Sequence, residues 1–125
     1  MEWEVFKLDQ TGGRTAPFVS IGRGQLDFNA VACELVGDYG EYKFAQILTG
    51  KERGKTVVAV KFLREYEENS ITIKRKVQQN GKSIQGMTVR NKDAIERLFG
   101  KDGSNKGMVR HKVEPIGENI LKIID

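Results

Sequence analysis

Apolar residues fall at every second position through much of this chain, which is the period of strands that bury one face. In the first half the alternation predicts strands over residues 3–8, 18–21 and 26–28, then a hairpin of 42–48 and 56–63. In the second half it predicts strands over 71–77 and 83–84, then a hairpin of 108–113 and 120–124. Strands therefore dominate the expected fold.

Two short stretches change to the helical period. Asn29 suits a helix N-cap because its side chain can accept a hydrogen bond from an orphan amide of the first turn. The pattern over 30–36 then predicts a helix that ends at Gly37, and the pattern over 91–99 predicts a second helix that ends at Gly100. Both helices are too short to be stable without tertiary packing.

The two halves of the chain resemble each other. A gapless shift of sixty-three residues places Ser20, Ile21, Leu35, Gly37, Gly40, Lys43 and Gly54 on Ser83, Ile84, Leu98, Gly100, Gly103, Lys106 and Gly117. The matched glycines fall where a helix ends or a hairpin turns. The sequence therefore predicts two tandem copies of one unit, residues 1–63 and 70–125, joined by a charged linker at 64–69 within a single domain, 1–125.

Each copy resembles the AbrB-type swapped-hairpin barrel superfamily, which includes transition-state regulators, MazE-type antitoxins and the tandem-repeat MraZ proteins. The resemblance is carried by the run Gly24 to Asn29, the helix Ala30 to Gly37 and the hairpin Tyr42 to Phe62. It implies a mainly β fold with two short helices, in which two ββαββ repeats form one pseudo-twofold, swapped-hairpin-like barrel. It also implies a DNA-binding, transcription-regulator-like function.

The chain departs from this superfamily at the positions that matter for DNA. Asn29 and Lys92 stand where the superfamily has a helix-opening proline. The superfamily's arginines after the glycine and on the helix are replaced here by Gln25, Cys33, Glu34, Thr88 and Glu96, and only Arg97 is retained. The resemblance thus supports the fold better than the function.

Charge adds a separate argument for nucleic acid. The net charge is +4, but residues 1–62 are neutral, with eight Lys/Arg and eight Asp/Glu. From residue 74 to residue 112, eleven Lys/Arg face three Asp/Glu, which favours a polyanionic partner. The candidate phosphate-binding residues are Lys74, Lys76, Lys82, Arg90, Arg97, Arg110 and Lys112.

Few aromatic residues accompany these cations, which favours duplex over single strands, and DNA is favoured over RNA. A basic surface that only keeps the protein soluble is the competing interpretation of the same residues.

The sequence offers little for catalysis. His111 is the single histidine, without an evident partner for a metal site or a catalytic triad, and a surface position is the default expectation. Gly22-Arg23-Gly24 lacks the rest of a phosphate-binding loop and predicts a tight turn. We therefore expect a protein that is not an enzyme and has no cofactor or metal.

Cellular context follows from two further features. The single cysteine, Cys33, fits a buried position and a reducing cytoplasm. No apolar run approaches the roughly 20 residues of a membrane span, so no membrane partner is expected.

The alternative function is a protein-interaction or structural module, antitoxin-like or an accessory protein of a phage or mobile element. The neutral first copy would then supply the contact face, with Trp3, Tyr39 and Tyr42 as exposed anchors, unless these aromatics cover the core. Self-association as a homodimer is compatible with either function.

Overall fold

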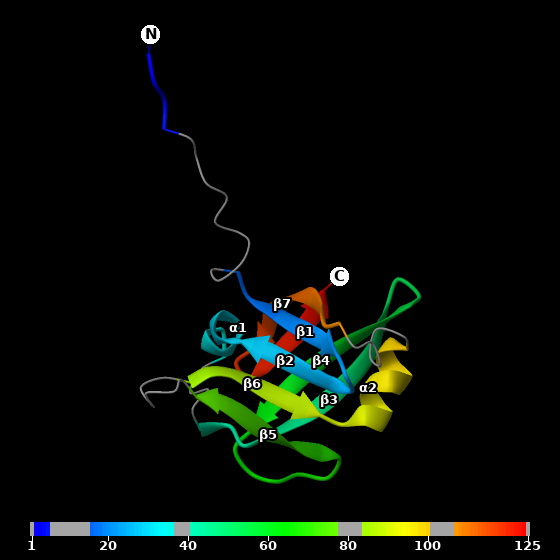
Figure 1. The fold of residues 1–125 in the computed structure, drawn as a ribbon. Coiled ribbons are helices and arrows are strands. Elements are labelled where there is room, and N and C mark those ends of the chain that lie inside the picture. The colour runs from blue at the N-terminus through cyan, green and yellow to red at the C-terminus, as the bar shows by residue number, and fades with distance from the viewer. Residues whose placement is uncertain (1, 6–15, 37–40, 78–83, 101–106, 125) are drawn as a thin grey trace.

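The computed structural model describes residues 2–5, 16–36, 41–77, 84–100 and 107–124, whose strands close into one barrel (Figure 1). The strands are β1 (Phe18–Gly22), β2 (Gln25–Asn29), β3 (Phe44–Glu52), β4 (Lys55–Leu63), β5 (Ser70–Val77), β6 (Ile84–Arg90), β7 (Val109–Gly117) and β8 (Ile120–Ile124). Helices α1 (Ala30–Glu34) and α2 (Lys92–Phe99) follow β2 and β6. The expected mainly β fold with two short helices is confirmed.

The strands follow the order β1-β2-β6-β5-β3-β4-β8-β7, and β7 returns to β1. All neighbouring strands are antiparallel. Four pairs join strands consecutive in the chain, whereas β2–β6, β3–β5, β4–β8 and β1–β7 each join a strand before residue 64 to one after residue 69. Closure leaves the barrel without an open edge.

The apolar side chains that alternate along the strands point inward and fill the barrel interior. The inward positions of β1, β2, β4 and β6 include Val19, Ile21, Leu26, Phe28, Val60, Phe62, Met87 and Val89, all buried. The Phe62 ring is fully buried in this core and meets Phe28 edge-on, with ring centroids 5.4 Å apart. The alternating apolar positions that the sequence shows in these strands are therefore the positions that form the core.

Both helices begin at an asparagine, but the two caps differ in reach. Asn29 Oδ1 accepts hydrogen bonds from the backbone N–H groups of Ala32 (2.9 Å) and Phe18 (3.1 Å), and its Nδ2 donates to the Ala16 carbonyl (2.8 Å). Asn91 Oδ1 accepts from the N–H three residues on, at 3.0 Å. Asn29 thus ties the start of α1 to the entry of β1, whereas Asn91 caps only its own helix.

The helix ends agree in part with expectation. α2 ends before Gly100, as predicted, and the positive φ of this residue (+58°, with ψ −128°) is a conformation that glycine adopts more readily than other residues. α1 ends earlier than predicted, with Leu35 as its C-cap, and Gly37 lies outside the described residues.

The predicted N-terminal strand is wrong over residues 3–5. Residues 2–5 belong to no strand, and Trp3 and Val5 are 87% and 93% exposed; residues 6–8 lie outside the described ranges. The physical reason is closure: each barrel strand already has two neighbours, so a further strand finds no edge to pair with.

The β3–β4 hairpin is longer than predicted. Its ladder continues to the pair Glu52↔Lys55, so the expected turn over 50–55 contracts to Arg53 and Gly54. Both turn residues have positive φ, 51° and 79°, as a two-residue turn matched to strand twist requires.

The gapless shift of sixty-three residues is wrong at Ile21 and Ile84. Ile21 lies in β1, the first strand of its hairpin, whereas Ile84 opens β6, the second strand of its own. The connections explain this: two residues separate β1 from β2, but residues 78–83 separate β5 from β6. At the helices the capping asparagines lie at positions 29 and 91, so the spacing there also differs from sixty-three.

Candidate nucleic-acid interface

A continuous row of outward-facing residues crosses the five adjoining strands β7, β1, β2, β6 and β5. Arg110 pairs with Ser20, Ser20 with Asp27, Asp27 with Thr88, and Thr88 with Lys74. Neighbouring strands lie about 4.8 Å apart, so the row measures about 19 Å along the sheet from Arg110 to Lys74. The row therefore places two exposed cations at its two ends.

A second row runs parallel to the first. Lys112 pairs with Phe18 across β7 and β1, and Lys76 pairs with Gly86 across β5 and β6. Lys112 is exposed beside Arg110, and the Arg110 guanidinium lies 4.5 Å from the centroid of the Phe18 ring. This cation–π contact holds Arg110 over β1 and covers the ring that lies on this face.

Asp27 occupies the middle of the first row. Its Oδ1 accepts a hydrogen bond of 2.6 Å from Thr88 Oγ1, and both of its carboxylate oxygens accept from Gln25 Nε2 at 3.1 Å. Asp27 is the acidic residue of this row, and an acidic residue disfavours phosphate contacts at the centre of the row. Contacts are therefore expected at the ends of the row, two strand spacings or about 10 Å from Asp27, near the limit of screening at physiological salt.

One end of β6 adds further cations. Arg90 is exposed and pairs with Gln25, and Lys92 opens α2 immediately beyond it. Gly24 (φ +73°) in the β1–β2 turn packs so closely that a Cβ there would lie 2.9 Å from Lys92 Cα, which places exposed Arg23 beside this helix start. Sequence reasoning left Arg23 and Lys92 out of the candidate set.

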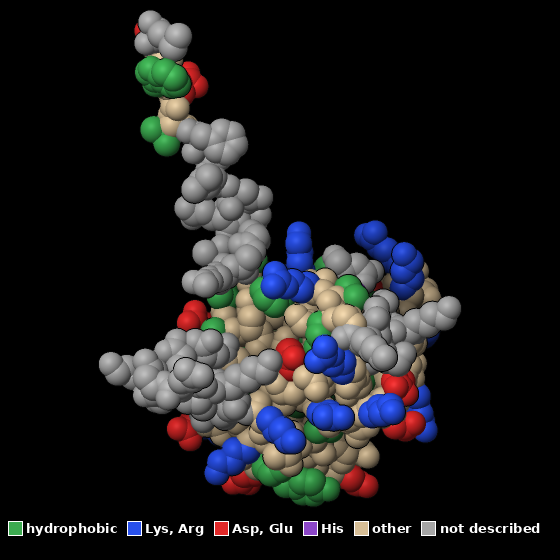
Figure 2. Space-filling model, viewed as in Figure 1, with side chains coloured by type: hydrophobic (Ala, Val, Ile, Leu, Met, Phe, Trp, Pro, Cys, Tyr) green, Lys and Arg blue, Asp and Glu red, His purple; other side chains and the backbone are tan. Residues whose placement is uncertain are grey.

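We call the set Lys74, Arg90, Arg110 and Lys112 the basic face. Figures 1 and 2 look onto its strands, and Figure 2 shows Lys and Arg side chains distributed over them. The outward positions follow from alternation, since Ile73, Val89 and Val113 on the same strands are buried.

Of the three other predicted residues, the structure describes the side chain of Arg97, which is not on this face. Arg97 lies on α2, exposed, with its guanidinium 3.2 Å from the Asp93 carboxylate one turn earlier. Such a surface pair contributes little stability but partly neutralises the arginine. The backbone of Lys76 lies in β5, but its side chain and all of Lys82 lie outside what the structure describes.

The Asp27–Thr88–Gln25 cluster was missed as a unit. Alternation around Leu26 and Phe28 already directed Asp27 outward. The pairing of β2 with β6, which brings Asp27 to Thr88, joins residues sixty-one positions apart and has no local signal.

The three aromatic residues proposed as anchors for a protein contact have different outcomes. Tyr42 is 5% exposed and packs on Phe62 in the core, so the expectation that it covers the core is confirmed. Trp3 is exposed, and Tyr39 lies outside the described residues.

Comparison with known proteins finds nothing similar: no family model, curated protein or solved structure matches the chain. Within the described residues, no helix combines the length and the apolar character that crossing a bilayer requires.

Proposed function

We propose that this protein binds duplex DNA through the basic face. The observation that carries the proposal is the register of β7, β1, β2, β6 and β5, which aligns Arg110 and Lys74 on one row with Arg90 and Lys112 beside it. In the sequence these cations are spread over thirty-nine positions, yet barrel closure brings their strands, β7, β6 and β5, into one run of five adjoining strands. Cations on a rigid sheet bind phosphates without an ordering cost for the backbone.

The row follows four of the eight strand steps of the barrel, or about half of its circumference, so the cations at its two ends lie on the flanks of a convex face. They would contact phosphates at separate places along a duplex. Lys and Arg contacts of this kind provide affinity and salt dependence but little sequence choice. Single strands are disfavoured, because the Phe18 ring on this face is covered by Arg110.

The barrel order also supports the proposed two-repeat, swapped-hairpin architecture. Exchanging each strand with the one four places later (β1 with β5, β2 with β6 and so on) returns the same closed order. The two hairpins of one half do not pair with each other: β1 pairs with β7, and β3 pairs with β5. Within this proposal the chain builds alone what two chains build in a homodimer, and we infer a cytoplasmic, regulator-like role.

The test is fluorescence anisotropy of labelled duplex and single-stranded oligonucleotides at several salt concentrations. We expect micromolar or tighter duplex binding whose logarithm falls linearly with the logarithm of salt, by about 0.9 for each phosphate contacted. The double variant K74Q/R110Q removes one cation from each end of the row. Its salt slope should fall by about 1.8 in magnitude, and its affinity should fall at every salt concentration tested.

The matched control is K51Q/K61Q, which removes two charges from β3 and β4 instead. Its slope and affinity should remain close to those of the parent protein. An equal loss in both variants would mean that net charge, not the basic face, drives binding. No binding of either oligonucleotide at low salt would refute the proposal.

The second candidate, a protein-interaction module, is favoured by the exposure of Trp3 (87%) and Tyr66 (69%). Exposed aromatic side chains are typical anchors of protein contacts. This candidate becomes the better one if the oligonucleotides fail to bind.

A further inference from the structure

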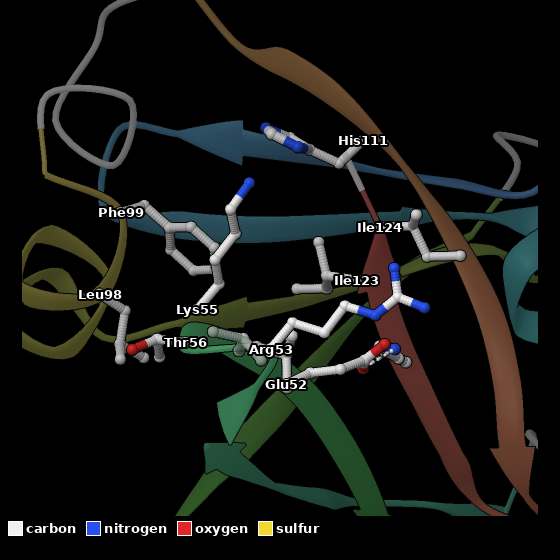
Figure 3. A pocket seen from close by; sticks show the side chains of 12 residues that line it. Glu52, Arg53, Lys55, Thr56, Leu98, Phe99, His111, Ile123 and Ile124 are labelled. Atoms are coloured by element: carbon white, nitrogen blue, oxygen red, sulfur yellow. Dashed lines mark hydrogen bonds and ion pairs between the residues drawn. The ribbon is translucent and has the colours of Figure 1, made fainter. Parts of the chain in front are cut away.

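A cavity of about 550 Å³ lies apart from the basic face, between the tip of the β3–β4 hairpin, the C-terminal end of α2 and strands β7 and β8 (Figure 3). This volume is within the roughly 300–1,000 Å³ typical of small-molecule sites.

One wall of the cavity is apolar. Leu98 and Phe99 reach it from α2, Ile123 and Ile124 from β8, and Val57 and Val58 from β4. Leu98, Phe99 and Ile124 are only half-buried, so their apolar surface faces the cavity instead of being sealed in the core. A bound apolar group would remove this surface from water.

The hairpin side of the cavity is cationic. Arg53 and Lys55 line it from the two-residue turn and the first position of β4, and both are exposed. Among the described residues, neither side chain has a hydrogen-bond or ion-pair partner. In Figure 3 the Lys55 side chain extends toward His111.

The other charges at the cavity are already matched. Lys122 Nζ donates to Glu52 Oε2 at 2.6 Å, so the carboxylate at the cavity is paired. The hydroxyl of Thr56 is engaged by Lys51 Nζ at 2.7 Å. The unbalanced charge of the lining is therefore that of Arg53 and Lys55.

His111 faces this cavity from β7, which corrects the expectation of a surface histidine. It is half-buried and lies between Arg110 and Lys112, whose side chains point to the opposite side of the strand. The cavity and the basic face thus use alternate residues of β7 and are separate surfaces.

We propose that the cavity binds a small organic monoanion, a carboxylate attached to an apolar body. The carboxylate is held by Arg53 and Lys55, and the body packs against Phe99, Leu98 and Ile123. A polyhydroxylated ligand is disfavoured, because the wall formed by α2, β4 and β8 is apolar and would leave hydroxyl groups without hydrogen-bond partners. This site does not depend on DNA binding.

The test is a titration of the isotope-labelled protein followed by two-dimensional NMR. The probes are 3-phenylpropionate, the neutral 3-phenylpropan-1-ol and the cationic 3-phenylpropylamine. We expect saturable shifts at the amides of Lys55, Phe99 and Ile123, with the carboxylate binding about tenfold tighter than the alcohol. The amine should bind more weakly than the alcohol.

Two variants separate the charge from the apolar wall. R53Q/K55Q should reduce the affinity for the carboxylate to that of the alcohol and leave the alcohol unchanged, whereas Leu98→Ala should weaken both. The control K61Q/K74Q removes two cations elsewhere and should keep the tenfold preference. Because Arg53 and Lys55 are exposed, the spectrum of the variant should retain the folded pattern.

Several outcomes would overturn the proposal. These are an absence of saturable shifts at the cavity, equal affinities for acid and alcohol, shifts confined to the strands of the basic face, or an equal loss in K61Q/K74Q.

Discussion

Strands β2 and β6 leave no room for a side chain at Gly86, and this provides a sharp test of the fold. Gly86 lies in β6 opposite Asn29 of β2. A Cβ at position 86 would lie 2.3 Å from the Phe28 carbonyl oxygen, although real Cβ atoms essentially never approach within 3.0 Å. Gly86→Ala therefore forces β2 and β6 apart by several tenths of an ångström.

The loss of stability follows from the two groups of β2 that would have to move, the Phe28 carbonyl and the Phe28 ring. The atom that blocks the methyl group is backbone, so no side chain can rotate away. Moving this carbonyl also moves the Phe28 ring, which is 2% exposed and packs edge-on against Phe62. Overpacking typically costs about 1–3 kcal/mol, and a site blocked by backbone belongs in the upper part of that range. We expect a loss of about 2–3 kcal/mol, or roughly 6–12 °C in Tm for a chain of this size.

The assay is urea unfolding followed by circular dichroism, with Gly50→Ala as the matched control. Gly50 is an exposed strand glycine in β3, and its Cβ would lie 3.7 Å from Val57 Cγ2, an ordinary contact. That substitution should be neutral or stabilise by up to about 1 kcal/mol, because alanine is less flexible in the unfolded chain. The reasoning is refuted if Gly86→Ala stays within about 0.5 kcal/mol of the parent, or if both variants lose stability equally.

Two further predictions concern polar contacts. Asn29→Ala removes a helix cap and the two hydrogen bonds that tie α1 to the entry of β1, and should reduce the free energy of unfolding by about 2–3 kcal/mol. Asn91→Ala removes only a cap and should reduce it by about 1 kcal/mol. Equal losses in urea unfolding would contradict the extra role assigned to Asn29. The hydrogen bond from Lys122 to Glu52 raises the pKa of Lys122 above its usual 10.5, so the stability from this pair is complete below about pH 10.5 and is lost as pH rises through the folded value. Glu52→Gln should flatten the alkaline loss of stability between about pH 9 and 12, and unchanged slopes in the two proteins would rule out this pair as the cause.

Local pattern in the sequence was sufficient for most strands and both helices. The hairpin of β3 and β4, strand β5 and helix α2 follow from periods of two and 3.6 residues, and α2 ends at Gly100, where φ is positive. The same alternation directed Lys74, Arg110 and Lys112 outward. The pattern failed at residues 3–5, where alternation is present but the closed barrel has no edge to pair with.

The tertiary structure alone decided which strands are neighbours. Period fixes the face of a strand on which a side chain lies, but the partner strand is chosen by how the whole core packs and by chain connectivity. Nothing local in the sequence joins Arg110 to Ser20, Asp27 to Thr88, or His111 to the α2 end at Phe99. The basic face and the cavity both consist of residues distant in the chain, so both exist only once the barrel has closed.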